Sequence, residues 1–228
     1  MDIEDTIKQK KPVRSWSGVL VVTVVMKPSK FSCPFDCHYC PNEHGQPRSY
    51  LSSEPAIMRA NRNDFDPIYQ FNNRMDMLGK NGHSLDKIEI IVLGGTFSSY
   101  PRHYQEEFIR DLFYAANIYT QKIDKREKKD IQFEKTENEK ADKKIIGISL
   151  ETRPDMITKF ELQRFRKLGC TRVQIGVQHT KDSILEYVNR GHTVEQSKKA
   201  ISLLKNAGFK DYMTIYQNIN FVGILAIK

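Results

Sequence analysis

The sequence predicts an α/β fold in which parallel strands alternate with helices. Apolar runs rich in β-branched residues indicate four buried strands, at 19–26, 88–93, 145–150 and 173–177. Segments with helical periodicity separate them, beginning with 66–78 and 103–117. This alternation predicts right-handed crossovers between parallel strands. Strands that are apolar on both faces fit a barrel or a doubly wound sheet.

The later part of the sequence continues the alternation of strands and helices. Helical segments are expected at 157–168 and 183–189, and Thr193 and Gln196 form a capping box that opens another helix, which ends near Gly208. Residues 212–216 are a candidate fifth strand. Residues 221–227 are a candidate sixth strand, but no crossover helix precedes them, so we expect the sheet to be incomplete at its C-terminal end.

The segment 120–144 interrupts the alternation with closely mixed charges. Its basic and acidic side chains are Lys122, Lys125, Arg126, Lys128, Lys129, Asp124, Glu127, Asp130, Glu134, Glu137 and Glu139. Such a composition is typical of a solvated loop or an exposed helix extension inserted between two core elements.

The overall composition narrows the class of protein. The net charge of +8 and the pI near 9.2 favour a polyanionic partner, RNA or DNA rather than a membrane. No run reaches the roughly 18 apolar residues of a membrane helix, and the polar N-terminus is not a secretory signal. We therefore expect a cytoplasmic protein without a membrane partner.

Three of the four cysteines lie within eight residues, directly after the first predicted strand. Cys33, Cys37 and Cys40 have the spacing C-x3-C-x2-C, which favours metal ligation over disulfides in a reducing compartment. Three thiolates would leave one iron of a cubane cluster open for a small ligand. The alternative is a zinc site completed by His38 or His44, although the spacing is not that of the paired zinc ribbons.

Other candidate site residues follow the next strands. Gly94, Gly95 and Thr96 would let the backbone approach a ligand, or form only a tight turn. Glu151 and Arg153 end the third strand, where they would either face a bound cofactor or pair with each other. Gln178 ends the fourth strand in the equivalent place.

The motifs together resemble a known family. The cysteine spacing, with Tyr39 before the last cysteine, resembles the signature of the radical-SAM superfamily, whose members use S-adenosylmethionine. The surrounding sequence is similar to the Elongator complex protein 3 family at 37–41, 49–55, 58–60, 65–67, 82–89, 92–97, 148–155, 169–172, 175–178 and 189–193. The likeness extends from about residue 19 to residue 209.

This resemblance implies a fold and a domain organisation. The fold would be a partial (β/α) barrel of the radical-SAM type, incomplete at its C-terminal end. We expect a basic polar remnant at 1–18, a radical-SAM core at 19–210 with the charged insertion 120–144, and a divergent tail at 211–228. The family enzymes extend further at both ends, so the chain is expected to be a truncated copy.

The resemblance also implies an activity and its site residues. Cys33, Cys37 and Cys40 would hold a [4Fe-4S] cluster, and Gly94, Gly95 and Thr96 would bind S-adenosylmethionine, with Glu151, Arg153 and Gln178 as further contacts. Lys87 matches a lysine that contacts acetyl-coenzyme A. The implied enzyme is a transferase that modifies C5 of the wobble uridine of transfer RNA, with acetyl-coenzyme A as co-substrate.

The partners implied by the family are transfer RNA and either other Elongator-type subunits or a separate acetyltransferase-like chain in place of the missing domain. The basic and aromatic stretch formed by Arg48, Tyr50, Arg59 and Arg62 suits RNA contacts, or is only a solvated face. The alternative function is a non-catalytic fragment that binds transfer RNA or an Elongator subunit.

Overall fold

The computed structural model describes residues 11–29, 33–119 and 126–215. Its centre is a parallel five-stranded sheet in the order β1-β2-β3-β4-β5, so each strand pairs with the next one along the chain. The strands are β1 (Leu20–Val25), β2 (Lys87–Leu93), β3 (Lys144–Thr152), β4 (Arg172–Gln178) and β5 (Lys210–Ile215). This confirms the predicted α/β class with parallel strands.

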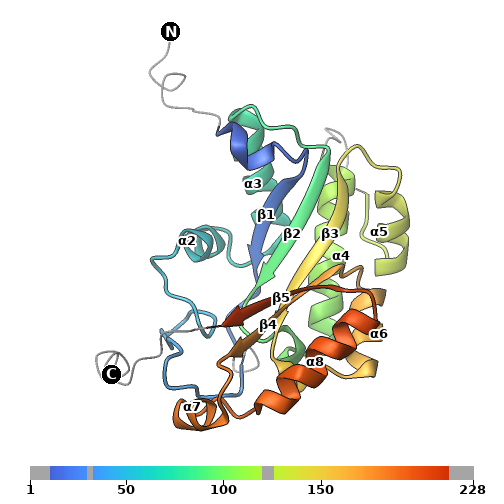
Figure 1. Cartoon of the computed structure of the whole chain (residues 1–228). Coiled ribbons are helices and arrows are strands. Elements are labelled where there is room, and N and C mark those ends of the chain that lie inside the picture. The colour runs from blue at the N-terminus through green and yellow to red at the C-terminus, as the bar shows by residue number, and fades with distance from the viewer. Residues whose placement is uncertain (1–10, 30–32, 120–125, 216–228) are drawn as a thin grey trace.

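Helices and short turns connect the strands (Figure 1). The helices are α2 (Pro55–Arg62), α3 (Pro67–Lys80), α4 (Arg102–Ile118), α5 (Ile131–Asn138), α6 (Lys159–Lys167), α7 (Asp182–Tyr187) and α8 (Val194–Asn206). The 3-10 turns are η1 (Pro12–Ser15), η2 (Phe97–Ser99) and η3 (Pro154–Met156). The predicted capping box of α8 is present, because Thr193 accepts from the Gln196 amide and Gln196 accepts from the Thr193 amide. None of the described helices has the length and apolar character needed to cross a bilayer.

One face of the sheet carries the hydrophobic core. Alternate strand residues are buried on this face, and aromatic side chains of α3, α4 and α6 pack in the same core, among them Phe71, Phe108 and Phe165. The ring of Phe165 meets that of Phe97 edge-on, with centroids 6.0 Å apart. The strand residues in this core include Leu20, Val22, Val24, Ile88, Ile90, Val92, Ile148, Leu150, Val173, Ile175 and Val177.

The opposite face is only partly covered by the described residues, which differs from the expectation of strands buried on both faces; Val25 of β1 is buried there against α2. Val21, Thr23 and Ile91 are half-buried, and Ile146 is 48% exposed. An ion pair between Glu89 of β2 and Arg172 of β4 also lies in the sheet, with N–O distance 2.8 Å. This face therefore mixes apolar and polar side chains, as the open interior of a partial barrel does.

The C-terminal part of the sheet extends beyond the predicted core boundary. β5 begins at Lys210 and runs through the first five residues of the predicted divergent tail 211–228. The candidate fifth strand is therefore observed, shifted by two residues at its start. The candidate sixth strand at 221–227 lies outside the described residues.

The insertion 120–144 is not simply solvated where the structure describes it. It contains α5, which packs on α4 and buries Glu134 and Asn138. Glu134 accepts two hydrogen bonds from Arg126, at 2.7 and 2.6 Å, and one from the amide of Asn117 at 2.9 Å. The mixed charges therefore include internal pairs that fix this segment against the core.

Candidate functional site

The carboxyl ends of the strands converge on the cysteine loop, between β1 and α2. In Figure 1 the arrowheads point toward the side of the molecule where α2 and α7 lie. A cavity of about 220 Å³ opens at this edge. Its lining includes Cys33, Cys37, Cys40, Tyr50, Gly95, Thr96, Glu151, Arg153, Gln178 and Arg190. Most of the predicted site residues are thus brought together.

The cysteine loop is fixed by contacts with the residues that follow α7 and with the segment before α2. The His38 amide donates to the Val188 carbonyl at 3.0 Å, and the Asn189 side-chain amide donates to the Asp36 carbonyl at 2.8 Å. Cys40 Sγ lies 2.8 Å from Ser49 Oγ. These contacts hold the loop over the strand ends although it has no regular secondary structure.

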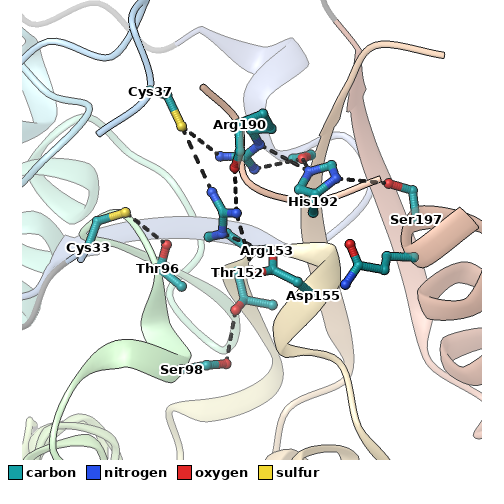
Figure 2. Close-up of polar contacts among 12 residues, drawn as sticks. Cys33, Cys37, Thr96, Ser98, Thr152, Arg153, Asp155, Arg190, His192 and Ser197 are labelled. Carbon is teal, nitrogen blue, oxygen red and sulfur yellow. Dashed lines mark hydrogen bonds and ion pairs between the residues drawn. The ribbon is translucent and has the colours of Figure 1, made fainter. Parts of the chain in front are cut away.

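Two arginines face Cys37, whose side chain is buried. Arg190 Nη1 lies 3.6 Å and Arg153 Nη1 3.9 Å from its sulfur (Figure 2). Arg153 is fully buried, pairs with Asp155 at 2.9 Å, and stacks on the ring of Phe35 at 3.5 Å. Two guanidinium groups therefore lie where an anionic sulfur or cluster would need compensating charge.

The glycine turn after β2 approaches the first cysteine. Thr96 Oγ1 donates to Cys33 Sγ at 3.4 Å (Figure 2). Gly94 has φ +147°, and a Cβ there would come within 2.9 Å of Met26 Cβ. Gly95 and Thr96 line the cavity, whereas Gly94 is required for packing beneath it.

Glu151 does not form the ion pair with Arg153 that was the alternative to a ligand contact. Its Oε2 accepts a hydrogen bond from the Tyr50 hydroxyl at 2.5 Å, while Arg153 pairs with Asp155. Burial raises the pKa of Glu151 from 4.5 to about 7, although the Tyr50 hydrogen bond and the Arg190 charge lower it. A carboxyl group in this state can donate or accept a hydrogen bond near neutral pH.

Gln178 offers the cavity a polar atom with no described partner. It has φ +70° at an irregularity in the β4–β5 register, a conformation that a non-glycine residue adopts rarely. Its Oε1 is buried without a hydrogen-bond partner among the described residues. A buried, unsatisfied carbonyl on the cavity wall suits a ligand that brings a donor.

The sequence analysis did not single out Arg190 as a site residue, although it lies inside one of the family-like stretches. Its Nη2 donates to the Gly176 carbonyl at 2.7 Å, and its Nε donates to His192 Nε2 at 3.1 Å. Burial and the positive charge of Arg190 lower the pKa of His192. Only the fold brings Arg190 against the cysteine loop.

Lys87 is not part of this cavity. It is exposed at the amino end of β2, whereas the cavity lies at the carboxyl end. β2 advances by six residue steps from Lys87 to Leu93, which corresponds to about 20 Å. The predicted basic and aromatic stretch 48–62 does not form one continuous surface. Tyr50 bonds to Glu151 at the cavity, whereas Arg59 lies on α2.

The arrangement of the three cysteines also bears on the zinc alternative. Across the described residues, no three His, Cys, Asp or Glu side chains are grouped as a metal-ion site, and this holds for a cluster as well as for zinc. A zinc ion needs four ligands around one point, and neither His38 nor His44 lines the cavity with the cysteines. Cysteines spread around an open cavity suit a larger cluster with one free position.

Comparison with known proteins decides between these possibilities. The sequence profile of the Radical SAM superfamily matches residues 30–224. The chain belongs to the radical SAM superfamily. The family implies a [4Fe-4S] cluster and S-adenosylmethionine as cofactors, and the donor set fits them, with three thiolates, two facing guanidiniums and the unsatisfied Gln178 oxygen on one cavity.

Curated relatives show which members of this superfamily the sequence is similar to. The tRNA uridine(34) acetyltransferase of Methanocaldococcus infernus is 41% identical over 210 residues, which cover 90% of this chain and 38% of the relative. Elongator complex protein 3 of Mus musculus is 37% identical over 226 residues, which cover 94% of this chain and 40% of the relative. The chain thus spans about two fifths of the length of these relatives.

A solved structure agrees with the sequence relatives. The archaeal Methanocaldococcus infernus Elp3 with an N-terminal deletion superposes with a TM-score of 0.69 at 32% identity. The superposition covers 88% of this radical SAM chain and 38% of that chain. The predicted resemblance to the Elongator complex protein 3 family is confirmed.

Proposed function

We propose that this chain performs the radical SAM step of a transfer RNA modification at C5 of uridine 34, with acetyl-coenzyme A as co-substrate. The observation that carries the proposal is the convergence of three cysteines, the Gly95–Thr96 backbone, Glu151 and Gln178 on one cavity. The printed names of the relatives support the choice of substrate. A cytoplasmic location belongs to the same proposal.

Each of these residues has a role that its contacts support. Cys33, Cys37 and Cys40 would hold the cluster, whose bound form supplies the electron for reductive cleavage of S-adenosylmethionine. Arg153 and Arg190 would compensate the negative charge beside Cys37. Because the cavity lies against the buried core, its walls would also limit the access of water.

Three polar groups would orient the methionyl and ribose parts of S-adenosylmethionine. The Gly95–Thr96 backbone offers polar groups close to Cys33, since no bulky side chain covers the glycine. Gln178 would accept a hydrogen bond from the ligand at its unsatisfied Oε1. Glu151, held by Tyr50, would accept from a ribose hydroxyl or an amino group on the same wall.

Two parts of the proposal need groups away from this cavity. Contact of Lys87 with acetyl-coenzyme A remains a proposal, and its place at the far end of β2 requires the coenzyme to lie along or beyond the sheet. Other Elongator-type subunits or a separate acetyltransferase-like chain are proposed partners. A non-catalytic, RNA-binding fragment would have no physical need for three cysteines around an open cavity, so catalysis is favoured.

The test is anaerobic purification and cluster reconstitution, followed by assays for iron and labile sulfide. The reduced protein is then incubated with S-adenosylmethionine and analysed for 5′-deoxyadenosine. We expect about four irons per chain and nucleoside release, both lost in Cys37→Ser and retained in Cys170→Ala. Iron binding without any nucleoside release would favour the non-catalytic fragment, and zinc without sulfide would favour the zinc site.

A further inference from the structure

Three arginines from separate elements lie close enough to repel one another, because, in addition to burial, the charge of Arg14 lowers the pKa of Arg59 and both of them lower that of Arg74. Arg14 is in η1, Arg59 in α2 and Arg74 in α3, and both helices pack on β1. Ser15 Oγ lies 2.9 Å from His83 Nδ1, which ties η1 to the loop after α3. Figure 1 shows the blue turn of η1 beside α3.

The guanidinium groups of this cluster have no protein partner among the described residues. Arg59 and Arg74 are half-buried, yet neither donates a hydrogen bond or forms an ion pair there with its side chain. Burial, together with the neighbouring positive charges, lowers the pKa of Arg74 to about 10 and also lowers that of Arg59. Three like charges held together without a carboxylate among the described residues carry a cost that a bound anion would remove.

The acidic residue on α3 does not neutralise this cluster. Asp76 accepts a hydrogen bond from the Tyr119 hydroxyl at 2.6 Å. α2 has no acidic residue and carries a second arginine, Arg62, in its last turn. The positive field is therefore left for a ligand from outside the described chain.

Both the spacing and the surroundings of the arginines suit a phosphate chain. Guanidinium groups bind phosphate oxygens in a fork geometry, and groups on three elements can engage successive phosphates. Trp16 follows η1 directly and is 77% exposed. An exposed indole beside arginines is a surface on which an unpaired base can stack.

We propose that Arg14, Arg59 and Arg74 form a phosphate-binding site for the RNA backbone, with Trp16 as its stacking surface. The identity of the polyanion as RNA rests on the proposed function. The site itself lies outside the cofactor cavity, whose lining includes none of these four residues. It would hold the RNA on the β1 side while the reacting base reaches the strand ends.

The test measures RNA binding by the full chain without S-adenosylmethionine. A fluorescein-labelled RNA stem–loop is titrated by anisotropy at several salt concentrations. For the double variant Arg59→Gln/Arg74→Gln we expect about tenfold weaker binding and a salt slope reduced by roughly 1.5, since each lost phosphate contact removes about 0.7–0.9. Lys199→Gln/Lys205→Gln, with the same charge change on exposed positions of α8, should change the affinity much less.

Trp16 is the only tryptophan in the chain, so its fluorescence reports the second half of the proposal. RNA should quench it in the unsubstituted protein and much less in the double arginine variant. Arg14→Gln, at an exposed position, provides a test if the double variant fails to fold. Equal binding by the arginine variants, equal loss in the α8 control, or displacement of the RNA by acetyl-coenzyme A would overturn the proposal.

The result of the RNA-binding experiment can be read separately from the result of the 5′-deoxyadenosine assay. RNA binding with no 5′-deoxyadenosine would leave the phosphate site standing while the proposed function fails. Nucleoside release with unchanged RNA affinity in the arginine variants would do the reverse.

Discussion

Glu151 lines the cavity, and its protonation makes the stability of the fold depend on pH. Burial raises its pKa to about 7, whereas the unfolded chain has the ordinary value of 4.5. The folded protein therefore binds a proton more tightly, so this contribution to stability is complete below pH 4.5 and disappears as the pH rises through 7. This contribution of Glu151 to the free energy of unfolding is about 2 kcal/mol, after a reduction because the side chain is partly exposed to solvent.

Glu151→Gln tests this linkage because it keeps the shape and removes the titration. The loss in melting temperature of the unliganded protein between pH 5 and 7.5 should be smaller in the variant than in the unsubstituted protein. Tyr50→Phe removes the hydrogen bond that lowers the pKa of Glu151, so it should steepen the dependence. Differential scanning fluorimetry measures all three proteins, and identical pH profiles would contradict the assignment.

Residue types in sequence were sufficient to predict that the cysteines and the polar groups at strand ends would lie close together, because parallel strands bring their carboxyl ends to one edge. They were not sufficient for Arg190, which reaches Cys37 only through the loop after α7. The sequence also gave no reason to separate Lys87 from the cavity. A residue at the start of a strand lies a full strand length from one at its end, whatever motif they share.

At the scale of elements, α5 shows where charge patterning misleads. Mixed charges predicted a solvated segment, but Glu134 is fully buried and paired with Arg126. Asn138 also caps the start of β3, since its Oδ1 accepts from the Ile145 amide at 2.7 Å. These contacts depend on Asn117 of α4, which no local pattern in the insertion could indicate.

The element-scale prediction is that Glu134→Ala destabilises the chain by about 2–4 kcal/mol. Its removal leaves Arg126 without its carboxylate and the Asn117 amide without one acceptor. Urea unfolding followed by circular dichroism measures the change. Glu139→Ala, an exposed position after the same helix, should stay within about 0.5 kcal/mol. Equal effects of the two substitutions would show that α5 contributes only as a solvated surface.

For the whole molecule, the sheet explains why one face serves stability and the other serves ligands. The main core lies on one face. On the other face α2 covers only the end of β1, where Val25 packs with Ile57 and Ala60. The described residues therefore leave Thr23, Glu89 and Arg172 less covered. The sequence predicted parallel strands, because a helix between consecutive strands favours a right-handed crossover, but the residues alone left a barrel and a doubly wound sheet open. It could not predict the uncovered face, since apolar runs look alike whether one or both faces are buried.

A ligand that binds only the folded chain must stabilise the whole sheet that positions its site. S-adenosylmethionine at a hundredfold excess over its dissociation constant should add about 2.7 kcal/mol to the reconstituted protein. For a chain of this size that corresponds to a rise in melting temperature of roughly 5–10 °C. Anaerobic scanning fluorimetry with and without S-adenosylmethionine measures the rise.

The shift should depend on the cluster ligands and on no other cysteine. Cys37→Ser is expected to lose it, because an intact cluster provides the open position to which the ligand binds. Cys170→Ala is the matched control, since Cys170 is buried in the main core away from the cavity. This variant should melt at a lower temperature without the ligand, as a core truncation does, yet keep the full rise with it. A full rise in Cys37→Ser would mean that S-adenosylmethionine binds this fold without the cluster.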